Sequence, residues 1–366
     1  MANLTVGDVI QGIGQSAPWS KAAGWDPVGL QLGDPANLME RAAVCHEVTE
    51  SVVATIEKDP VDLLVSYHPL LFHPTARLVA GRTPAGRALR LIARGVALGV
   101  VHTNFDVAPN GAADALADAL GLTNTVGFGP LPGVDSVKVV SFVPGEQVDR
   151  VAAAMSAAGA GRIGNYHSCS YRSDGTGTFV AENWAAPTVG SVGEFTREPE
   201  VRLEMIAPRH AEAAVVAALI DFHPYEEPAY DVFDRRGTDG LVGRVGRPPA
   251  GTTVRSFASL ASEALGGGDV RLTWGGPEFN LVAVVPGSGA AFIDPALAAG
   301  ADLLVTGDVS HHRARHAADS GLGLIDPGHA RTERPGVARL LELVAGVAPE
   351  VTDLTGLDPS PWEPVQ

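Results

Sequence analysis

The stretch Leu324-Ile-Asp-Pro-Gly-His-Ala-Arg-Thr-Glu333 passes from a short apolar run into a segment that places His329 and Glu333 one helical turn apart. Side chains four residues apart lie on one face of a helix, so an imidazole and a carboxylate at this spacing can bind one metal ion. An apolar strand followed by a helix is the repeating unit of α/β proteins, whose sites form beyond the carboxyl ends of the strands. The stretch therefore predicts an α/β fold with a metal site at a strand end.

Two other segments end in metal-ligand side chains after an apolar run. Leu63-Leu-Val-Ser-Tyr-His68 ends in a histidine, and Val100-Val-His-Thr-Asn-Phe-Asp106 ends in an aspartate. Three such strand ends from distant parts of the chain predict one shared site, and imidazole and carboxylate ligands suit zinc, manganese or iron(II). The alternative, from these residues alone, is a set of solvated loop histidines beside ordinary charges.

Composition and charge narrow the class of protein. The chain has 366 residues, more than one hydrophobic core usually serves, so two or more domains are expected. A hydrophobic content of 45% and a charged content of 19% are typical of a globular protein. The net charge of −16 disfavours nonspecific binding of nucleic acid, which needs a basic surface. It still allows a small anion to bind at a metal ion or a helix N-terminus.

Cysteine usage and the distribution of apolar residues indicate a cytoplasmic protein. Cys45 and Cys169 are far apart in the sequence and belong to no CxxC pair, so each is expected to be a small apolar filler. The N-terminal residues lack a basic segment followed by an apolar run, and no run of about 18 apolar residues occurs. We expect no membrane contact.

Both ends of the chain are predicted to alternate strands and helices. The expected strands are 41–44, 63–67, 96–102, 269–274, 280–285, 303–306 and 322–326, and the expected helices are 49–56, 85–94, 111–120, 254–265, 287–299, 310–319 and 332–347. Thr332 is the expected N-cap of the last helix, with Pro335 in its first turn. Buried strands separated by helices predict largely parallel pairing in two βαβ-type lobes.

The middle of the chain is predicted to be a separate small domain. Its expected order is β-α-β-β-α-β, over 138–143, 146–158, 175–180, 201–206, 211–220 and 229–233, which is typical of a ferredoxin-like α+β fold. The turn-rich segments Gly127–Gly133 and Arg235–Gly240 flank it. We therefore expect a metal-binding α/β domain made from residues 1–130 and 237–366, interrupted by a ferredoxin-like insert over 131–236.

Five motifs, in order along the chain, resemble those of one known family. They are Trp25-Asp-Pro-Val-Gly-Leu-Gln31, Ser66-Tyr-His-Pro-Leu-Leu-Phe72, His102-Thr-Asn-Phe-Asp106, Thr306-Gly-Asp308 with His312, and Asp326-Pro-Gly-His-Ala-Arg-Thr-Glu333. The family is the Nif-three-like group of hexameric proteins with a dinuclear metal centre, also named GTP cyclohydrolase 1 type 2 homologs. The middle resembles the optional insert of this family through Gly161–Tyr166, Gly175–Phe179 and His223–Pro228.

The resemblance implies metal ligation by His68, Asp106, His329 and Glu333, with two divalent ions (zinc, manganese or iron) in each subunit of a homohexamer. One position departs from the family motif, which has two adjacent histidines, because the first of them is Tyr67 here. A neutral phenol is a poor metal ligand. Either one metal ion loses a protein ligand, or Tyr67 merely lines the site, and the second interpretation is favoured.

Several other motifs have two interpretations. His102 and His312 either support the ligands or contact the substrate, or they are hydrogen-bonded structural histidines. Gly287-Ser-Gly289 either cradles a phosphate at a helix N-terminus or simply connects two elements. The segment His223–Pro228 could bind metal, but prolines at both ends favour a stiff structural corner. The insert resembles small trimeric sensing domains of the PII and CutA type, which implies regulation.

The sequence supports two functional hypotheses. The first is a metal-dependent hydrolase, for which the resemblance implies opening of a purine nucleotide ring such as that of GTP. The second is a non-catalytic metal-binding ring whose insert senses a nucleotide or another small anionic ligand. A general base beside the metal ions would separate the two hypotheses. No catalytic residue can be assigned from the sequence, because the obvious carboxylates are already candidate ligands.

Overall fold

The computed structural model describes residues 4–131, 136–163, 166–235, 240–273 and 279–357. The chain divides into two compact units, which we describe separately. The outer unit comprises Met1–Leu131 and Asp239–Gln366, and the inserted unit comprises Pro132–Thr238. The part of the chain that is described contains no helix long and apolar enough to cross a membrane.

The first sheet of the outer unit has five strands in the order β1-β4-β3-β2-β15. These are β1 (Gly29–Leu32), β4 (Ala97–Val100), β3 (Leu63–Ser66), β2 (Arg41–Cys45) and β15 (Glu350–Asp353). All neighbours pair in parallel except β1, which is antiparallel to β4. Every residue of β3 and β4 is buried, because helices cover both faces of the sheet.

Two hydrophobic cores lie on the two faces of this sheet. Alternate strand residues such as Val44 and Val65 pack with α1 (Val6–Ser16) and α11 (His329–Ala345) on one face. Their neighbours pack with α2 (Glu50–Lys58) and α3 (Pro84–Ala93) on the other. The parallel strands therefore all end at one edge of a rigid, doubly covered sheet.

The second sheet of the outer unit has six strands in the order β11-β14-β13-β12-β10-β5. These are β11 (Arg271–Thr273), β14 (Gly323–Asp326), β13 (Leu303–Val305), β12 (Val282–Val284), β10 (Gly240–Arg247) and β5 (Thr123–Leu131). The three central strands are parallel, and the outer ones are antiparallel. The helices packed on it are α5 (Ala112–Ala119), α8 (Val254–Ala264), α9 (Ile293–Ala298) and α10 (His311–Asp319).

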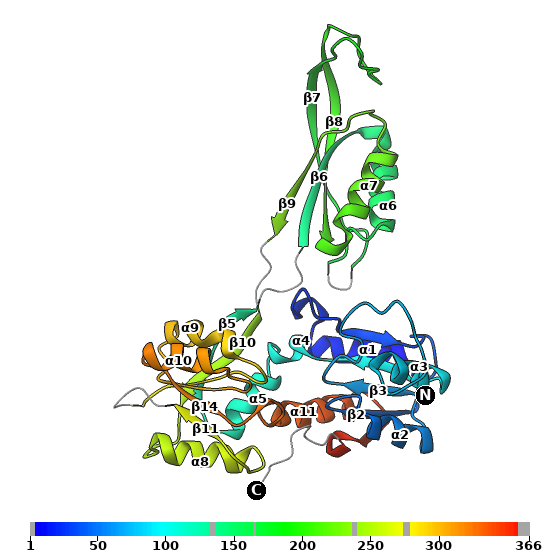
Figure 1. Cartoon of the computed structure of the whole chain (residues 1–366). Coiled ribbons are helices and arrows are strands. Elements are labelled where there is room, and N and C mark those ends of the chain that lie inside the picture. Colours follow the sequence, from blue (N-terminus) through cyan, green and yellow to red (C-terminus); the bar gives the residue numbers. More distant parts are fainter. Residues whose placement is uncertain (1–3, 132–135, 164–165, 236–239, 274–278, 358–366) are drawn as a thin grey trace. The chain divides into compact units, whose positions relative to one another are not determined.

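Helices α5 and α11 lie between the two sheets (Figure 1) and contact each other closely. A Cβ atom on Gly336 of α11 would lie 2.5 Å from the Cβ of Ala112 in α5, so the glycine permits this approach. The remaining short elements of the outer unit are α4 (Thr103–Asp106), η1 (Trp19–Lys21), η4 (Ala290–Phe292) and η5 (Thr355–Leu357). This packing brings α11 from the C-terminal part of the chain to the strand ends of the first sheet.

The inserted unit has the element order β-α-β-β-α-β. Its elements are β6 (Ser136–Pro144), η2 (Gly145–Gln147), α6 (Val148–Ala157), β7 (Tyr171–Val180), β8 (Phe195–Pro208), η3 (Arg209–Ala211), α7 (Glu212–Phe222) and β9 (Tyr230–Arg235). The strands form an antiparallel sheet in the order β7-β8-β6-β9. Val139, Leu203, Met155 and Leu219 belong to a separate hydrophobic core of this unit.

The expected mixed α/β architecture with several sheets is confirmed, but two local predictions are wrong. The last helix begins at His329, so Thr332 is not its N-cap and Pro335 lies beyond its first turn. The segment expected to be turn-rich before the insert is largely strand β5, which pairs with β10. The second expected turn, residues 235–240, lies largely outside the described residues, as do Trp274 and residues 164–165 of one insert motif.

Candidate metal centre

The parallel register of the first sheet places several polar side chains at one edge. Cys45 at the end of β2 pairs with Ser66 at the end of β3. His46 therefore follows β2 where Tyr67 and His68 follow β3, and the His68 amide N–H donates to the His46 carbonyl at 3.0 Å. Strand β4, the next neighbour, ends just before His102. These strand ends lie where sites are expected in α/β sheets.

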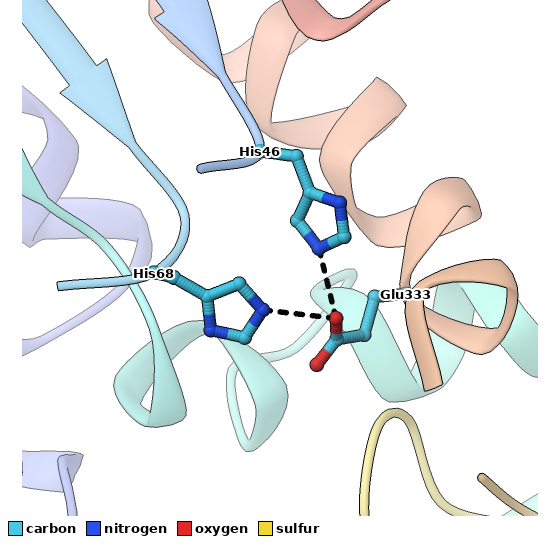
Figure 2. Close-up of side chains that lie close together, drawn as sticks. All are labelled: His46, His68 and Glu333. Carbon is cyan, nitrogen blue, oxygen red and sulfur yellow. Dashed lines mark hydrogen bonds and ion pairs between the residues drawn. The ribbon is translucent and has the colours of Figure 1, made fainter. Parts of the chain in front are cut away.

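Two imidazoles from these strand ends meet a carboxylate from α11 (Figure 2). His46 Nε2 lies 2.8 Å and His68 Nε2 lies 3.0 Å from Glu333 Oε2. The ligand atoms of these three residues all lie within 4.8 Å of one another. The side chains of His46 and Glu333 are only 6% and 4% exposed, whereas that of His68 is 19% exposed, so water can reach this donor set only from the side of His68. We call these three residues the donor triad.

The second oxygen of Glu333 faces a third imidazole. His329 Nε2 lies 3.0 Å from Glu333 Oε1, and His329 Nδ1 lies 2.8 Å from Asp308 Oδ2. Burial acts to raise the pKa of Glu333, but hydrogen bonds from His329, His46 and His68 outweigh it and hold that pKa well below its usual range. The hydrogen bond to Glu333 is the main cause that raises the pKa of His329 to about 9.

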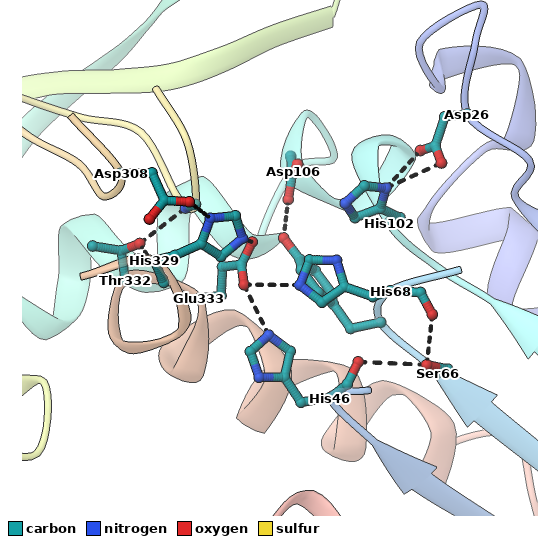
Figure 3. Close-up of polar contacts among 12 residues, drawn as sticks. Asp26, His46, Ser66, His68, His102, Asp106, Asp308, His329, Thr332 and Glu333 are labelled. Carbon is teal, nitrogen blue, oxygen red and sulfur yellow. Dashed lines mark hydrogen bonds and ion pairs between the residues drawn. The ribbon is translucent and has the colours of Figure 1, made fainter. Parts of the chain in front are cut away.

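Tyr67 and Asp106 form a buried pair. Figure 3 shows Asp106 beside the residues of the donor triad. The Tyr67 hydroxyl donates a hydrogen bond to Asp106 Oδ1. Burial is the main cause that raises the pKa of Asp106 to about 7. Burial, followed by the nearby charge of Asp106, raises the pKa of Tyr67 well above 10. The phenol is therefore neutral in this structure and serves as a hydrogen-bond donor.

His102 is held at the edge of the site by Asp26. Its Nδ1 lies 3.0 Å from both carboxylate oxygens of Asp26, which also accepts the Thr103 backbone N–H at 3.0 Å. Burial acts to lower the pKa of His102, but the hydrogen bond to Asp26 and the nearby carboxylates raise it overall. The His102 ring centroid lies 5.0 Å from that of His68. This histidine can hold a proton beside the donor triad.

The structure brings most of the sequence-predicted site residues together. His68 and Glu333 belong to the donor triad, His329 contacts Glu333, Asp106 contacts Tyr67, and the His102 ring lies against His68. His312 instead lies exposed in the first turn of α10. Among the described contacts, its ring lies edge-on to the ring of His311, with the two centroids 5.5 Å apart.

Glycine loops close the wall of the site on the side of α11. A Cβ atom on Gly287 would lie 2.5 Å from Glu333 Oε1, and one on Gly307 would lie 2.5 Å from the His329 Cα. The amide N–H groups of Gly287 and Gly289 donate to the hydroxyls of Thr332 at 2.9 Å and Thr306 at 2.7 Å. Because these amides are already paired, the loop is better described as a close-packed connection than as a phosphate cradle.

His46 is the residue of the donor triad that the sequence interpretation missed. It directly follows the apolar strand Arg41–Cys45, in the same way that His68 follows β3 after Tyr67. The strand-end criterion that selected His68 would also have selected His46 if it had been applied to β2. The family motifs gave no reason to look there, because none of them includes this residue.

The corner His223–Pro228 in the inserted unit has a structural role. His223 Nε2 lies 3.1 Å from the Phe142 carbonyl, and its Nδ1 accepts the Tyr225 backbone N–H at 3.1 Å. Both ring nitrogens are therefore used in local hydrogen bonds. This arrangement agrees with the favoured interpretation of a stiff corner.

The fold and the donor triad define an α/β protein with a candidate metal centre at its strand ends. Residues 4–355 match the model of the family described as Duf34/NIF3 (NGG1p interacting factor 3), so the chain belongs to this family. The family resemblance expected from the motifs is thereby confirmed.

Relatives of similar length carry one shared name. A protein of Mycobacterium tuberculosis named GTP cyclohydrolase 1 type 2 homolog is 39% identical over 354 residues, covering 93% of this chain and 92% of its own length. A Bacillus subtilis protein of the same name is 36% identical and covers 91% of each chain. The crystal structure of a Bacillus cereus protein related to NIF3 covers 100% of both chains, with 32% identity and a TM-score of 0.64.

Proposed function

We propose that this protein binds divalent metal ions at the donor triad and acts as a metal-dependent hydrolase. The observation that carries the proposal is the convergence of the ligand atoms of His46, His68 and Glu333 within 4.8 Å, with His46 and Glu333 buried and His68 half-buried. A buried carboxylate surrounded by imidazoles fits a divalent ion well, because neutral imidazole and carboxylate are the ligands of zinc, manganese and iron(II). A bound ion of this kind supplies a Lewis acid for hydrolysis.

We propose that Glu333 would help to hold two divalent ions, because its two oxygens face different histidines. Its Oε2 faces His46 and His68, whereas its Oε1 faces His329. Asp106 lies close by and would complete the set named by the resemblance, namely His68, Asp106, His329 and Glu333. In this proposal His46 supplies the imidazole that Tyr67 does not. The His46 and Tyr67 ring centroids are 5.7 Å apart, so either side chain reaches the same region.

The residues around the donor triad position the ligands. Asp308 accepts a hydrogen bond from His329 Nδ1, which leaves Nε2 directed at Glu333. Tyr67 orients Asp106 by donating a hydrogen bond to one of its carboxylate oxygens.

The relatives named GTP cyclohydrolase 1 type 2 homolog suggest a nucleotide such as GTP as the substrate class.

A second candidate function is a non-catalytic metal-binding ring with a regulatory insert. The observation in its favour is that each described carboxylate at the site is already engaged: Asp26 with His102, Asp106 with Tyr67, Asp308 with His329, and Glu333 with three histidines. No general base is left to assign among them.

We further propose that the inserted unit is ferredoxin-like. Its β-α-β-β-α-β order and its antiparallel strand order β7-β8-β6-β9 support this proposal. We also propose that six chains form a closed ring.

Turnover by metal-loaded protein distinguishes the two functions. GTP and simple phosphoesters are incubated with the wild type and with the His329→Ala variant, which removes one proposed ligand. The hydrolase proposal predicts turnover by the wild type and its loss in the variant. Equal rates for the two proteins would indicate contaminating activity and favour the regulatory function.

Light scattering tests the proposed ring of six chains. We expect a mass of six chains, and a monomeric mass at micromolar concentration would contradict the proposal.

A further inference from the structure

Two large aromatic side chains of the outer unit are exposed next to the candidate metal centre. Trp25 is 59% exposed and Phe72 is 44% exposed. Their ring centroids lie 5.7 Å apart with an interplanar angle of 42°, so they form a single aromatic surface, which we call the aromatic pair. Large apolar side chains left in water beside a polar site are typical of a binding surface.

The backbone under both rings is fixed by hydrogen bonds. Trp25 directly precedes Asp26, whose carboxylate accepts from His102 and from the Thr103 backbone. Phe72 directly follows Leu71, whose N–H donates to Gln31 Oε1 at 2.8 Å and whose carbonyl accepts from Gln31 Nε2 at 3.0 Å. The aromatic pair is therefore carried by a preorganised backbone, which lowers the entropy cost of binding a ligand.

A continuous series of ring contacts joins the aromatic pair to the donor triad. The Trp25 ring lies edge-on to His102 with centroids 6.3 Å apart, and the His102 and His68 centroids are 5.0 Å apart. His68 Nε2 is 3.0 Å from Glu333 Oε2. The His102 ring therefore contacts both the aromatic pair and a residue of the donor triad, which places the two within reach of one small molecule.

We propose that Trp25 and Phe72 bind a planar heteroaromatic ring of the substrate by stacking. The ligand class is then a ring-bearing compound with an anionic group that reaches the metal centre, as in a nucleoside monophosphate. Aromatic side chains stack on any planar base without sequence-specific hydrogen bonds. This inference rests on the proposed metal centre, and it adds the part of the substrate that the donor triad itself does not recognise.

Binding of ligands with and without a ring tests the inference. Metal-loaded full-length protein is titrated by calorimetry with guanosine monophosphate, adenosine monophosphate and ribose 5-phosphate. Both nucleotides should bind more tightly than ribose 5-phosphate, and Trp25→Leu or Phe72→Leu should weaken nucleotide binding by about tenfold. Binding of ribose 5-phosphate and metal content should not change. Trp184→Leu is the matched control, since Trp184 is a fully exposed tryptophan in the inserted unit and should have no effect.

Three results would overturn the inference. One is equal affinity of the wild type for the nucleotides and ribose 5-phosphate, or no binding of either nucleotide. The second is unchanged nucleotide binding in both leucine variants. The third is a smaller oligomer in the leucine variants, which would mean that a second copy of the chain covers the aromatic pair. Failure of the proposed function appears separately, as wild-type protein without bound metal or without turnover.

Discussion

At the scale of single residues, Glu333 is the centre of the proposed site. Its side chain is 4% exposed, and a carboxylate buried to this extent is costly unless charged or hydrogen-bonding groups compensate. Here His46 and His68 compensate one oxygen and His329 the other. The low pKa of Glu333 that results, after burial is outweighed by these hydrogen bonds, keeps it ionised and ready for a cation.

Gly287→Ala should weaken metal binding by about tenfold or more, because the new methyl group would displace a ligand oxygen. Its Cβ would lie 2.5 Å from Glu333 Oε1, and the backbone φ of 63° is unfavourable for alanine. Gly321→Ala is the matched control, with φ 82° and no atom within 4 Å of the added Cβ. Both variants should lose about 1–2 kcal/mol of stability. Equal metal affinity of the two, measured by competition with a chelating dye, would contradict this account.

The donor set could be predicted from the sequence only in part. His68 and Glu333 were identified from strand ends and helical spacing, and both belong to the donor triad. His46 also follows an apolar strand, so the same criterion applies to it, but its place beside Tyr67 depends on the parallel register of β2 with β3, which is a tertiary property. His312 was named from a motif, yet a motif does not say which way a helix turns its side chains.

At the scale of elements, alternating strands and helices at both chain ends were predictable because buried parallel strands are short apolar runs. Strand β5 was not, because Gly127, Gly129 and Pro130 are typical turn residues. In the structure a Cβ atom on Gly127 would lie 2.7 Å from Leu241 Cδ1 and 3.0 Å from its Cβ, so glycine lets the Leu241 side chain of β10 pack against β5. The start of α11 at His329 also differs from the expectation. The Thr332 hydroxyl accepts a hydrogen bond from the Gly287 backbone N–H instead of capping the helix.

The inserted unit should lose stability in acid through His223. Burial lowers the pKa of His223, and its Nδ1 already accepts the Tyr225 N–H, so protonation would break that hydrogen bond. As the pH falls, the unfolded chain therefore binds a proton at His223 at a higher pH than the folded chain does. The contribution of neutral His223 to stability is complete above a pH of about 6.5 and is lost as the pH falls below that value. Denaturation of wild type and His223→Gln at several pH values checks this. The variant should show a weaker loss, and identical pH dependence would refute the assignment.

At the scale of the whole molecule, two distant chain segments build one unit around the site, and the third segment folds on its own core. The last residue of β5, Leu131, pairs with the first residue of β10, Gly240. The chain therefore leaves the outer unit and returns to it at neighbouring positions. A separate core in the inserted unit gives a physical reason for treating it as an insertion.

The outer unit should fold and bind metal without the inserted unit. Replacing residues 132–239 by a Gly-Ser linker of about four residues would join β5 to β10 as a simple hairpin. We expect a soluble protein with a cooperative unfolding transition and the metal content of the full chain. An insoluble or unfolded product would show that the outer unit depends on the insert.

The central claim is that the metal centre uses His46, His68 and Glu333, with Tyr67 as a supporting hydrogen-bond donor. Elemental analysis of protein purified without chelators tests it most directly, on the wild type and the His46→Ala, Glu333→Ala and Tyr67→Phe variants. The account predicts bound divalent metal in the wild type and in Tyr67→Phe, and its loss in His46→Ala and Glu333→Ala. Full metal stoichiometry in His46→Ala and Glu333→Ala, or its loss in Tyr67→Phe, would contradict it.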